Sequence, residues 1–292
     1  LGLTRPKMRF SDQWNISAFL LKRVIRDLVE STLKVPLLYG KRLLQKANVQ
    51  RYGLPDFIII GAHKCGTTAL HVNMNLHPQI SVVNGAFKGG EMFFFNRDEL
   101  YLKAGIDYYR SFFRRSKLIQ GEETPDYISS LECHERILET VPDAKLILTL
   151  RNPVDRAYSH WNHFNMMGRK TKEWGWVDAP FEECAEQDLT GLLTRGRYVE
   201  QIEHLLTYFK PEQLHILIAE HARRSPTEEY RRVFAFLGVD EVADLPFLRT
   251  VHARPYPESM NKETRQELLG YFESYNERLF DFLGYRVGSW AR

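Results

Sequence analysis

The sequence predicts an α/β fold in three layers, in which helices flank both faces of a central, mostly parallel sheet. Short apolar segments alternate with amphipathic segments from about residue 54 onward, and this alternation is typical of parallel strands joined by helices. The segment FIIIGAHKCGTTAL, residues 57–70, has the pattern of a buried strand, a loop between two glycines and a helix start. We therefore expect a P-loop-type fold, because strand, glycine loop and helix follow in that order.

Five apolar segments are expected to form the strands of the sheet. They are DFIIIG (56–61), ISVV (80–83), KLIQG (117–121), KLILTL (145–150) and LHILIA (214–219). The first is almost wholly apolar, which is typical of a central strand covered on both faces.

Six segments have the spacing of helices. They are TTALHVNMNL (67–76), SLECHERILETV (130–141), NPVDRAYSHWNHFNMM (152–167), RYVEQIEHLLTYF (197–209), SPTEEYRRVFAFLG (225–238) and a last helix over 262–283. In the fifth, Ser225 and Glu228 predict a capping box, and Gly238 marks the end. In the sixth, one apolar stripe is predicted from Leu268, Phe272, Tyr275, Leu279 and Phe282.

The chain is expected to divide into an N-terminal helical arm, 1–53, and one domain, 54–292. Apolar residues in the arm recur at helical spacing with Lys and Arg between them. Such a helix either packs on the domain or docks on a membrane surface or a partner. The loops around 84–92 and 168–195 are long, which is typical of binding loops or lids.

Composition excludes several classes of protein. The net charge is +3 without a basic cluster, so we expect no nucleic-acid partner. Three cysteines argue against a disulfide framework and favour a reducing compartment. The sequence has no apolar run of about 20 residues, the length needed for a membrane span. We therefore expect a cytoplasmic protein without a transmembrane segment, with the Golgi lumen as the alternative if the N-terminus has been trimmed.

The loop between Gly61 and Gly66 predicts a phosphate site. Backbone N–H groups at such a loop, and the dipole of the following helix, attract an anion. ATP-binding loops carry a lysine directly after the second glycine, where this chain has Thr67, and Lys64 lies inside the loop instead. The alternative interpretation is a structural turn with an exposed lysine.

A second anion site is predicted at the end of the 145–150 strand. P-loop NTPases carry a metal-supporting carboxylate at such a strand end, but here Arg151 follows. We therefore expect no metal. The Arg151 guanidinium and the Ser159 hydroxyl suit a second phosphate group, whereas a surface ion pair between Arg151 and Asp155 is the alternative. Two separate phosphate sites indicate a nucleotide with phosphates at both ends.

The loop and the Arg151–Ser159 pair together resemble those of sulfotransferases that use 3′-phosphoadenosine 5′-phosphosulfate (PAPS). The likeness is closest to the carbohydrate and heparan sulfate sulfotransferase branch and its bacterial relatives. Four further elements resemble that branch in order: GEMFFF (90–95), GEETPDYI (121–128), RGRYVEQIEHLLTYF (195–209) and the segment from HARPYP (252–257) to Trp290. The resemblance implies that 54–292 is a PAPS-dependent sulfotransferase domain.

The resemblance also implies roles for individual residues. Glu91 would be the catalytic base, and Lys64 would stabilise charge on the bridging oxygen. The nucleotide would be held by Lys64, Cys65, Gly66, Thr67, Thr68, Ala69, Arg151, Ser159, Tyr198 and Arg254. Tyr198 would line the adenine pocket, with plain helix packing as the alternative. The acceptor would lie near Lys88, Glu123 and His163. The histidines at 160, 163 and 252 are alternative bases.

Three departures from the family's pattern concern the acceptor. Gly90 replaces a lysine before Glu91, Glu123 replaces a lysine, and His252-Ala253 replaces Lys-Gly. Fewer cations argue against a highly sulfated glycan. We expect transfer of a sulfuryl group from PAPS to an acceptor hydroxyl, on a saccharide by default, with release of 3′,5′-ADP. The alternatives are a carrier-bound β-hydroxyacyl or other small-molecule hydroxyl, an ATP-dependent small-molecule kinase, and a nucleotide-binding scaffold without turnover.

Overall fold

The computed structural model describes residues 51–87, 89–171, 179–247, 256 and 258–291, with backbone alone at 167–171. Of the predicted arm, residues 1–50 lie outside this range. Lys88, His252 and Arg254 lie outside it as well, so the roles predicted for them stay predictions.

The centre of the molecule is a five-stranded parallel sheet. Its strands are β1 (Phe57–Gly61), β2 (Ile80–Val83), β3 (Ile119–Glu123), β4 (Lys145–Leu150) and β5 (Leu214–Ile218), in the order β2-β3-β1-β4-β5. All five predicted strands are confirmed, although β3 begins two residues later than expected. Every residue of β1 is buried, because this strand lies in the middle of the sheet with helices on both sides.

Helices connect the strands. The longer ones are α2 (Thr67–Met74), α4 (Leu131–Thr140), α5 (Pro153–Thr171), α7 (Tyr198–Leu205), α9 (Pro226–Leu237) and α10 (Lys262–Leu283). Shorter ones are α3 (Ile106–Arg110), α6 (Phe181–Glu186) and α8 (Ala219–Arg224). Single turns are η2 (Glu99–Ala104), η3 (Tyr127–Ser129), η4 (Leu189–Gly191), η5 (Thr194–Gly196), η6 (Pro211–Gln213) and η7 (Gly288–Ala291). All six predicted helices are present.

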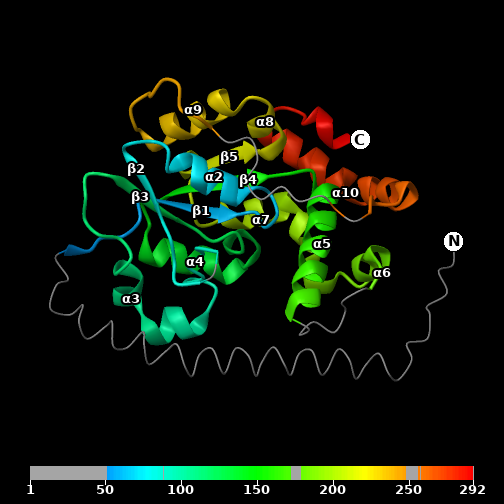
Figure 1. The fold of residues 1–292 in the computed structure, drawn as a ribbon, viewed down its shortest axis with the longest axis horizontal. Coiled ribbons are helices and arrows are strands. Elements are labelled where there is room, and N and C mark those ends of the chain that lie inside the picture. The colour runs from blue at the N-terminus through cyan, green and yellow to red at the C-terminus, as the bar shows by residue number, and fades with distance from the viewer. Residues whose placement is uncertain (1–50, 88, 172–178, 248–255, 257, 292) are drawn as a thin grey trace.

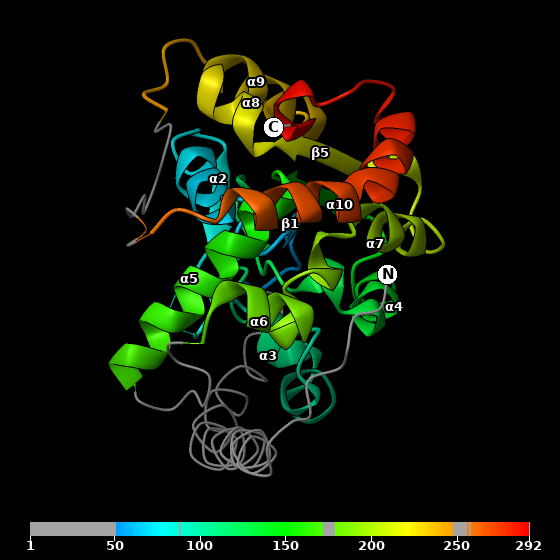
Figure 2. The same cartoon turned by 90° about the vertical axis from the view of Figure 1, so that its right-hand side faces the viewer.

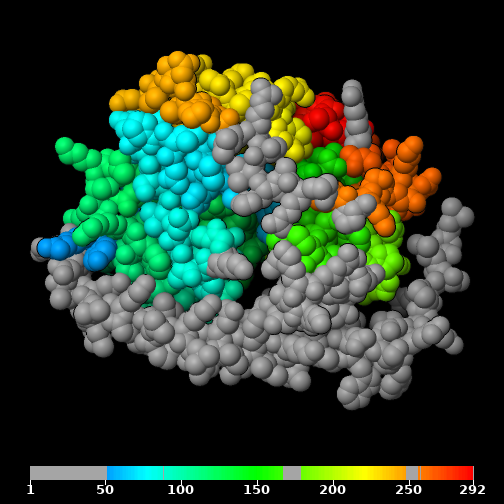
Figure 3. Space-filling model, in the orientation of Figure 1, coloured from blue at the N-terminus to red at the C-terminus, as the bar shows by residue number. Residues whose placement is uncertain are grey.

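Two apolar clusters fill the spaces between the sheet and its helices, which confirms the three-layer prediction. Phe57 and Ile59 of β1 pack with residues of α2 and α9 on one face. Ile58 and Ile60 point to the opposite face and pack with residues of α3, α4 and α7. In Figures 1 and 2, α9 lies on one side of the sheet and α4 on the other. The surfaces of α2 and of the segment around α9 adjoin in the space-filling view (Figure 3).

A third cluster joins α5, α6 and α10 at the side of the sheet. Phe272 of α10 is fully buried there with Val154 of α5 and Phe181 of α6. The bounds of α10 agree with the prediction, and so does its stripe as far as Leu279, since Leu268, Phe272 and Leu279 are buried and Tyr275 packs on the core. The last predicted member is wrong, because Phe282 is 44% exposed and Phe280 is buried in its place. This cluster fixes α10 against α5, the helix that begins just beyond β4.

The predicted capping box at the start of α9 is wrong. No side-chain cap forms at Ser225; its carbonyl oxygen accepts a hydrogen bond from the Glu229 N–H instead. Glu228 pairs with Arg232 one turn later. Gly238 ends the helix with a left-handed φ of 81°, as predicted.

Within the described residues, none of the helices has both the length and the apolar character required to cross a bilayer.

Candidate active site

The loop after β1 has open space at the start of α2. Gly66 is the N-cap of α2, with a φ of 92°, and a Cβ placed on it would meet no atom within 4 Å. At the other end of the loop, a Cβ on Gly61 would collide with the Ile128 side chain. The first N–H groups of a helix have no partner within the helix, so the start of α2 presents donors to an anion. Of the two threonines there, Thr67 is buried and Thr68 exposed.

Hydrogen bonds fix the loop to β4. The Ala62 N–H donates to the Thr149 carbonyl at 2.9 Å, and the Thr149 hydroxyl donates to the Cys65 carbonyl at 3.1 Å. Lys64, between these points, has a left-handed φ of 67° and is half-buried. Its charge helps to lower the pKa of His63 to about 3, although burial is the larger cause. The positive charge of Lys64 is thus close to the His63 ring.

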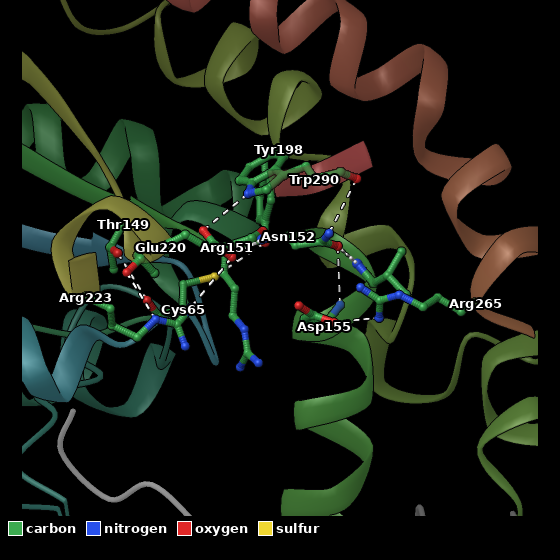
Figure 4. Close-up of polar contacts among 12 residues, drawn as sticks. Cys65, Thr149, Arg151, Asn152, Asp155, Tyr198, Glu220, Arg223, Arg265 and Trp290 are labelled. Carbon is green, nitrogen blue, oxygen red and sulfur yellow. Dashed lines mark hydrogen bonds and ion pairs between the residues drawn. The ribbon is translucent and has the colours of Figure 1, made fainter. Parts of the chain in front are cut away.

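The Cys65 side chain points into the protein, toward Tyr198. Its thiol lies 3.4 Å from the Tyr198 hydroxyl, and burial raises its pKa to about 11. A neutral, buried thiol is unreactive, so Cys65 serves as packing beneath the loop. The Tyr198 hydroxyl also donates to the Arg151 carbonyl oxygen at 2.8 Å. One phenol therefore joins the phosphate loop to the end of β4 (Figure 4).

Tyr198 lies in the core beneath the loop. It is 2% exposed, and its ring lies 6.0 Å from the ring of Trp290. This packing agrees with the alternative that the sequence left open. The predicted contact with adenine stays a prediction.

Arg151 directly follows β4, and its Nε is buried without a hydrogen-bond partner. In Figure 4 its side chain extends away from the strand end, into the space between Cys65 and α5. Burial alone would lower the pKa of Arg151, but Tyr256 and Asp155 outweigh it and raise the pKa. Asp155, the alternative ion-pair partner, binds Arg265 of α10 at 2.7 Å. A buried guanidinium nitrogen without a partner fits an anionic ligand.

Asn152 caps α5 immediately after Arg151. Its Oδ1 accepts hydrogen bonds from the N–H groups of Val154 at 2.9 Å and Asp155 at 3.4 Å. Ser159 lies further along α5 and is 7% exposed. Arg151 and Ser159 thus belong to one rigid unit formed by the strand end, the cap and the helix.

Glu220 clamps this unit to the C-terminal segment. Its carboxylate accepts from the Asn152 N–H at 3.0 Å and from the Trp290 indole N–H at 3.2 Å. Figure 4 shows Glu220 and Trp290 on the side of the strand end opposite α5. Sequence reasoning missed Glu220, because no local pattern distinguishes it from other acidic residues in helices. The predicted likeness around Trp290 was the one signal pointing to this region.

The loop that carries Glu91 is held tightly. A Cβ on Gly85 would collide with the Glu91 carbonyl oxygen, and one on Gly89 would collide with the Glu91 carboxylate. Gly90 has a φ of 97°, a region that lysine rarely adopts. The conformation of this loop therefore accounts for a glycine where the family's pattern has a lysine before Glu91. Burial raises the pKa of Glu91; a backbone hydrogen bond opposes this, and the charge of Glu123 adds to it.

Glu123 ends β3 and is hydrogen-bonded to a histidine of the neighbouring helix. Its carboxylate lies 3.0 Å from His71 Nδ1 of α2, and both residues are buried. A lysine in place of Glu123 would face this histidine. The predicted contact between Glu123 and the acceptor stays a prediction. The Glu123 carboxylate already has His71 as a hydrogen-bond partner.

Three histidines gather beside the loop. The ring of His63 lies 4.6 Å from that of His160 and 6.2 Å from that of His163. Burial lowers the pKa of His160, and the charge of His63 lowers it further. Neighbouring Asp126 pairs with Arg195, an interaction that the sequence did not predict. His163 therefore lies close to the loop, and its predicted contact with the acceptor stays a prediction.

A pocket of about 380 Å³ lies at the opposite end of the sheet. It is lined by residues that precede or begin the strands, such as Pro55, Asp56 and Lys145. The loop, Arg151 and Glu91 instead lie at the carboxyl ends of the strands, where ligands of open parallel sheets bind. The pocket is therefore separate from the candidate active site.

The sequence is similar to those of known sulfotransferases. Residues 54–262 match the sulfotransferase domain family. The bifunctional heparan sulfate N-deacetylase/N-sulfotransferase 3 of Mus musculus is 30% identical, over 82% of this chain and 31% of its own length. The membrane-associated sulfotransferase kil1 of Dictyostelium discoideum is 25% identical, over 79% of this chain and 65% of its own. The chain spans about a third of the length of the heparan sulfate relatives that it matches.

Solved structures share the fold. A sulfotransferase from Alicyclobacillus acidocaldarius superposes with a TM-score of 0.64 at 28% identity, over 82% of this chain and all of its own. The sulfotransferase STF9 from Mycobacterium avium gives a TM-score of 0.56 at 12% identity, over 86% of this chain and 84% of its own, which supports the fold alone. The family match includes the phosphate loop, Glu91, Arg151 and Ser159 and covers most of the chain, so the protein belongs to the sulfotransferase family.

Proposed function

We propose that the protein transfers a sulfuryl group from PAPS to an acceptor hydroxyl and releases 3′,5′-ADP. The observation that carries the proposal is the link through Tyr198 between the phosphate loop and Arg151. This link would hold the two proposed anion sites in one fixed relation, as a nucleotide with phosphates at both ends requires. The family match supports the same chemistry.

The 5′-phosphate would bind at the start of α2. Gly66 leaves room for an anion there, and Thr67 and Thr68 provide N–H groups at the first turn. The N–H group of Ala69, which was also predicted to hold the nucleotide, donates to the Gly66 carbonyl oxygen at 3.0 Å. The 3′-phosphate would bind the Arg151 guanidinium, whose buried Nε has no partner, together with Ser159 and Arg254. Each phosphate thus has donors on a rigid element.

The reaction would be an in-line displacement at sulfur. Glu91 takes the proton of the acceptor hydroxyl while the acceptor oxygen forms a bond to sulfur. The bond between sulfur and the 5′-phosphate oxygen breaks, and its electron pair stays on that oxygen. Lys64 stabilises the charge that develops there. The raised pKa of Glu91 makes its carboxylate a stronger base than an exposed glutamate.

A saccharide is the acceptor that the relatives support best, since several are named for heparan sulfate N-sulfotransfer. Those names also make an amine a candidate acceptor group. A carrier-bound β-hydroxyacyl chain or another small hydroxyl compound remains the alternative. Transfer of labelled sulfate from PAPS to sugar hydroxyls, amino sugars and acyl carriers would identify the class.

Ligand-dependent thermal unfolding tests the nucleotide assignment. A ligand that binds the folded state raises the melting temperature, so 3′,5′-ADP should stabilise the protein without Mg²⁺. Stabilisation by ATP only in the presence of Mg²⁺, without an effect of 3′,5′-ADP, would favour a kinase instead. Binding of 3′,5′-ADP without transfer to any acceptor tested would favour a nucleotide-binding scaffold.

A further inference from the structure

A fully buried carboxylate lies beneath the loop that carries Glu91. Glu122 of β3 is 0% exposed, and among the described residues no cation pairs with it. Its Oε2 accepts a hydrogen bond from the Thr124 hydroxyl at 2.8 Å, and its Oε1 accepts one from the Tyr109 hydroxyl at 3.1 Å. A buried carboxylate is costly unless it is hydrogen-bonded, so these hydroxyls explain how Glu122 is tolerated.

The bond to Glu122 orients the Thr124 hydroxyl. Because its proton points to the carboxylate, the Thr124 oxygen is left to accept hydrogen bonds. It accepts two, from the N–H groups of Met92 at 3.1 Å and Phe93 at 3.2 Å. The Tyr127 hydroxyl accepts from the next two N–H groups along the chain, at 2.9 and 3.4 Å. Two side-chain oxygens thus bind the four consecutive N–H groups that follow Glu91.

This segment needs such support because it has no regular structure. Residues 91–95 are in neither helix nor strand, and Phe93 has a left-handed φ of 50°. Buried backbone N–H groups require partners, and the side chains of β3 and η3 provide them. On the other side of Glu91, the Gly85 N–H donates to the Gly90 carbonyl at 2.6 Å. The backbone at Glu91 is therefore held from both sides.

We propose that Glu122 and Thr124 are positioning residues, which hold the 92–95 backbone and so aim the Glu91 carboxylate at the acceptor. The role of Glu91 rests on the proposed function, whereas the hold on the backbone does not. A displacement of about 1 Å at a reacting group costs about 100-fold in rate, so loss of this hold should be visible in turnover.

Substitutions at Thr124 test the hold directly. Thr124→Val removes the oxygen that accepts both N–H groups, and Thr124→Ser retains it. Hydrogen–deuterium exchange of peptides covering 92–95 should accelerate at least 10-fold in Thr124→Val and stay near wild type in Thr124→Ser. Unchanged exchange in Thr124→Val would overturn the proposal.

A second pair of variants keeps the test decisive if Thr124→Val fails to fold. Tyr109→Phe removes one donor to Glu122, and Tyr108→Phe removes a hydroxyl from the adjacent buried tyrosine, which lies outside the network. We expect faster exchange at 92–95 in Tyr109→Phe alone. Equal exchange in the two variants would contradict the role of Glu122.

A double-mutant cycle tests whether Thr124 acts through Glu91. Thr124→Val should lower kcat about 10- to 100-fold, with little change in the KM for PAPS or in the Kd for 3′,5′-ADP. Combined with Glu91→Gln, it should lower kcat little further. Fully multiplicative losses would show that Thr124 acts independently of Glu91 and overturn its positioning role.

Failure of the proposed function gives a different result. In that case wild type transfers no sulfate from PAPS, or Glu91→Gln keeps wild-type activity. The exchange at 92–95 would still decide whether Glu122 and Thr124 hold this backbone.

Discussion

The Tyr198 hydroxyl lies 2.8 Å from the Arg151 carbonyl oxygen and donates a hydrogen bond to it. The Tyr198 hydroxyl oxygen also lies 3.4 Å from the Cys65 thiol. A residue of α7 thus links the ends of two strands, β1 at Gly61 and β4 at Leu150, which are far apart in sequence. The geometry of both proposed anion sites should depend on this contact.

Tyr198→Phe should weaken binding of 3′,5′-ADP. The ring would still pack on Trp290, but the Arg151 carbonyl would lose its buried donor, at a cost of about 1–3 kcal/mol. Calorimetry should show an affinity about 5- to 10-fold lower, with a modest fall in melting temperature. Tyr208→Phe, in the turn after α7, is the control and should change neither quantity. An unchanged affinity in Tyr198→Phe would show that the link is dispensable.

Arg151→Lys should weaken binding at the proposed 3′-phosphate site and leave the proposed 5′-phosphate site unchanged. Lysine keeps the charge but loses the planar fork that binds a phosphate through two nitrogens. We expect the affinity for 3′,5′-ADP to fall about 10-fold or more, while 5′-AMP, which has no 3′-phosphate, should bind the variant and wild type equally. An equal loss for both nucleotides would assign Arg151 to a part of the ligand that they share.

Glu91→Gln should abolish most turnover while leaving nucleotide binding intact. Loss of a general base lowers kcat by about 100- to 10,000-fold. In wild type, kcat/KM should rise with pH as Glu91 loses its proton. Because burial raises the pKa of Glu91, this rise should lie above pH 4.5, the usual pKa of a glutamate. Activity of the variant within a few-fold of wild type would move the role of base to one of the histidines beside the loop.

Glu122→Gln should change how stability depends on pH. Burial raises the pKa of Glu122 from 4.5 to about 7 in the folded protein, against hydrogen bonds from Thr124, Tyr127 and Tyr109. The folded state therefore keeps a proton that the unfolded state has lost, and wild-type stability falls by about 3 kcal/mol between pH 4.5 and 7. Glutamine does not titrate, so the variant should lack this fall.

Melting temperatures at pH 5 and pH 8 measure the effect. Between pH 5 and pH 8, the melting temperature of Glu122→Gln should rise relative to that of wild type by roughly 5–10 °C. Glu228→Gln is the control, because Glu228 forms an exposed pair with Arg232, and surface pairs contribute little. A pH-independent difference would mean that Glu122 does not titrate in this range.

The sequence predicted the sheet well, because its strands are short, apolar and separated by helical segments. It was less accurate where local patterns compete with tertiary contacts. Ser225 and Glu228 have capping-box spacing, but Glu228 binds Arg232 instead. In α10, Phe282 fits the apolar stripe, yet the core takes Phe280. Periodicity cannot distinguish two neighbouring aromatic positions at the edge of a helix face.

The candidate site was predictable where one segment carries the chemistry. The phosphate loop and Arg151 each follow a strand, so their place at the carboxyl edge of the sheet could be inferred. The support beneath them could not. Glu220 binds Asn152 and Trp290, which are far away in sequence, and Glu122 acts through Thr124, whose hydroxyl reaches the distant Met92 and Phe93 N–H groups only in the folded chain. The predicted role of Glu123 took no account of His71, because only the fold brings α2 next to β3.

The clamp between Glu220 and Trp290 has a consequence for the order of assembly. The Trp290 indole completes the contacts behind Arg151, so a ribosome must release nearly the whole domain before the nucleotide site can close. Every residue proposed to touch the nucleotide has been synthesised by residue 254. A released chain truncated after residue 280 should therefore carry all of these residues and still bind 3′,5′-ADP weakly.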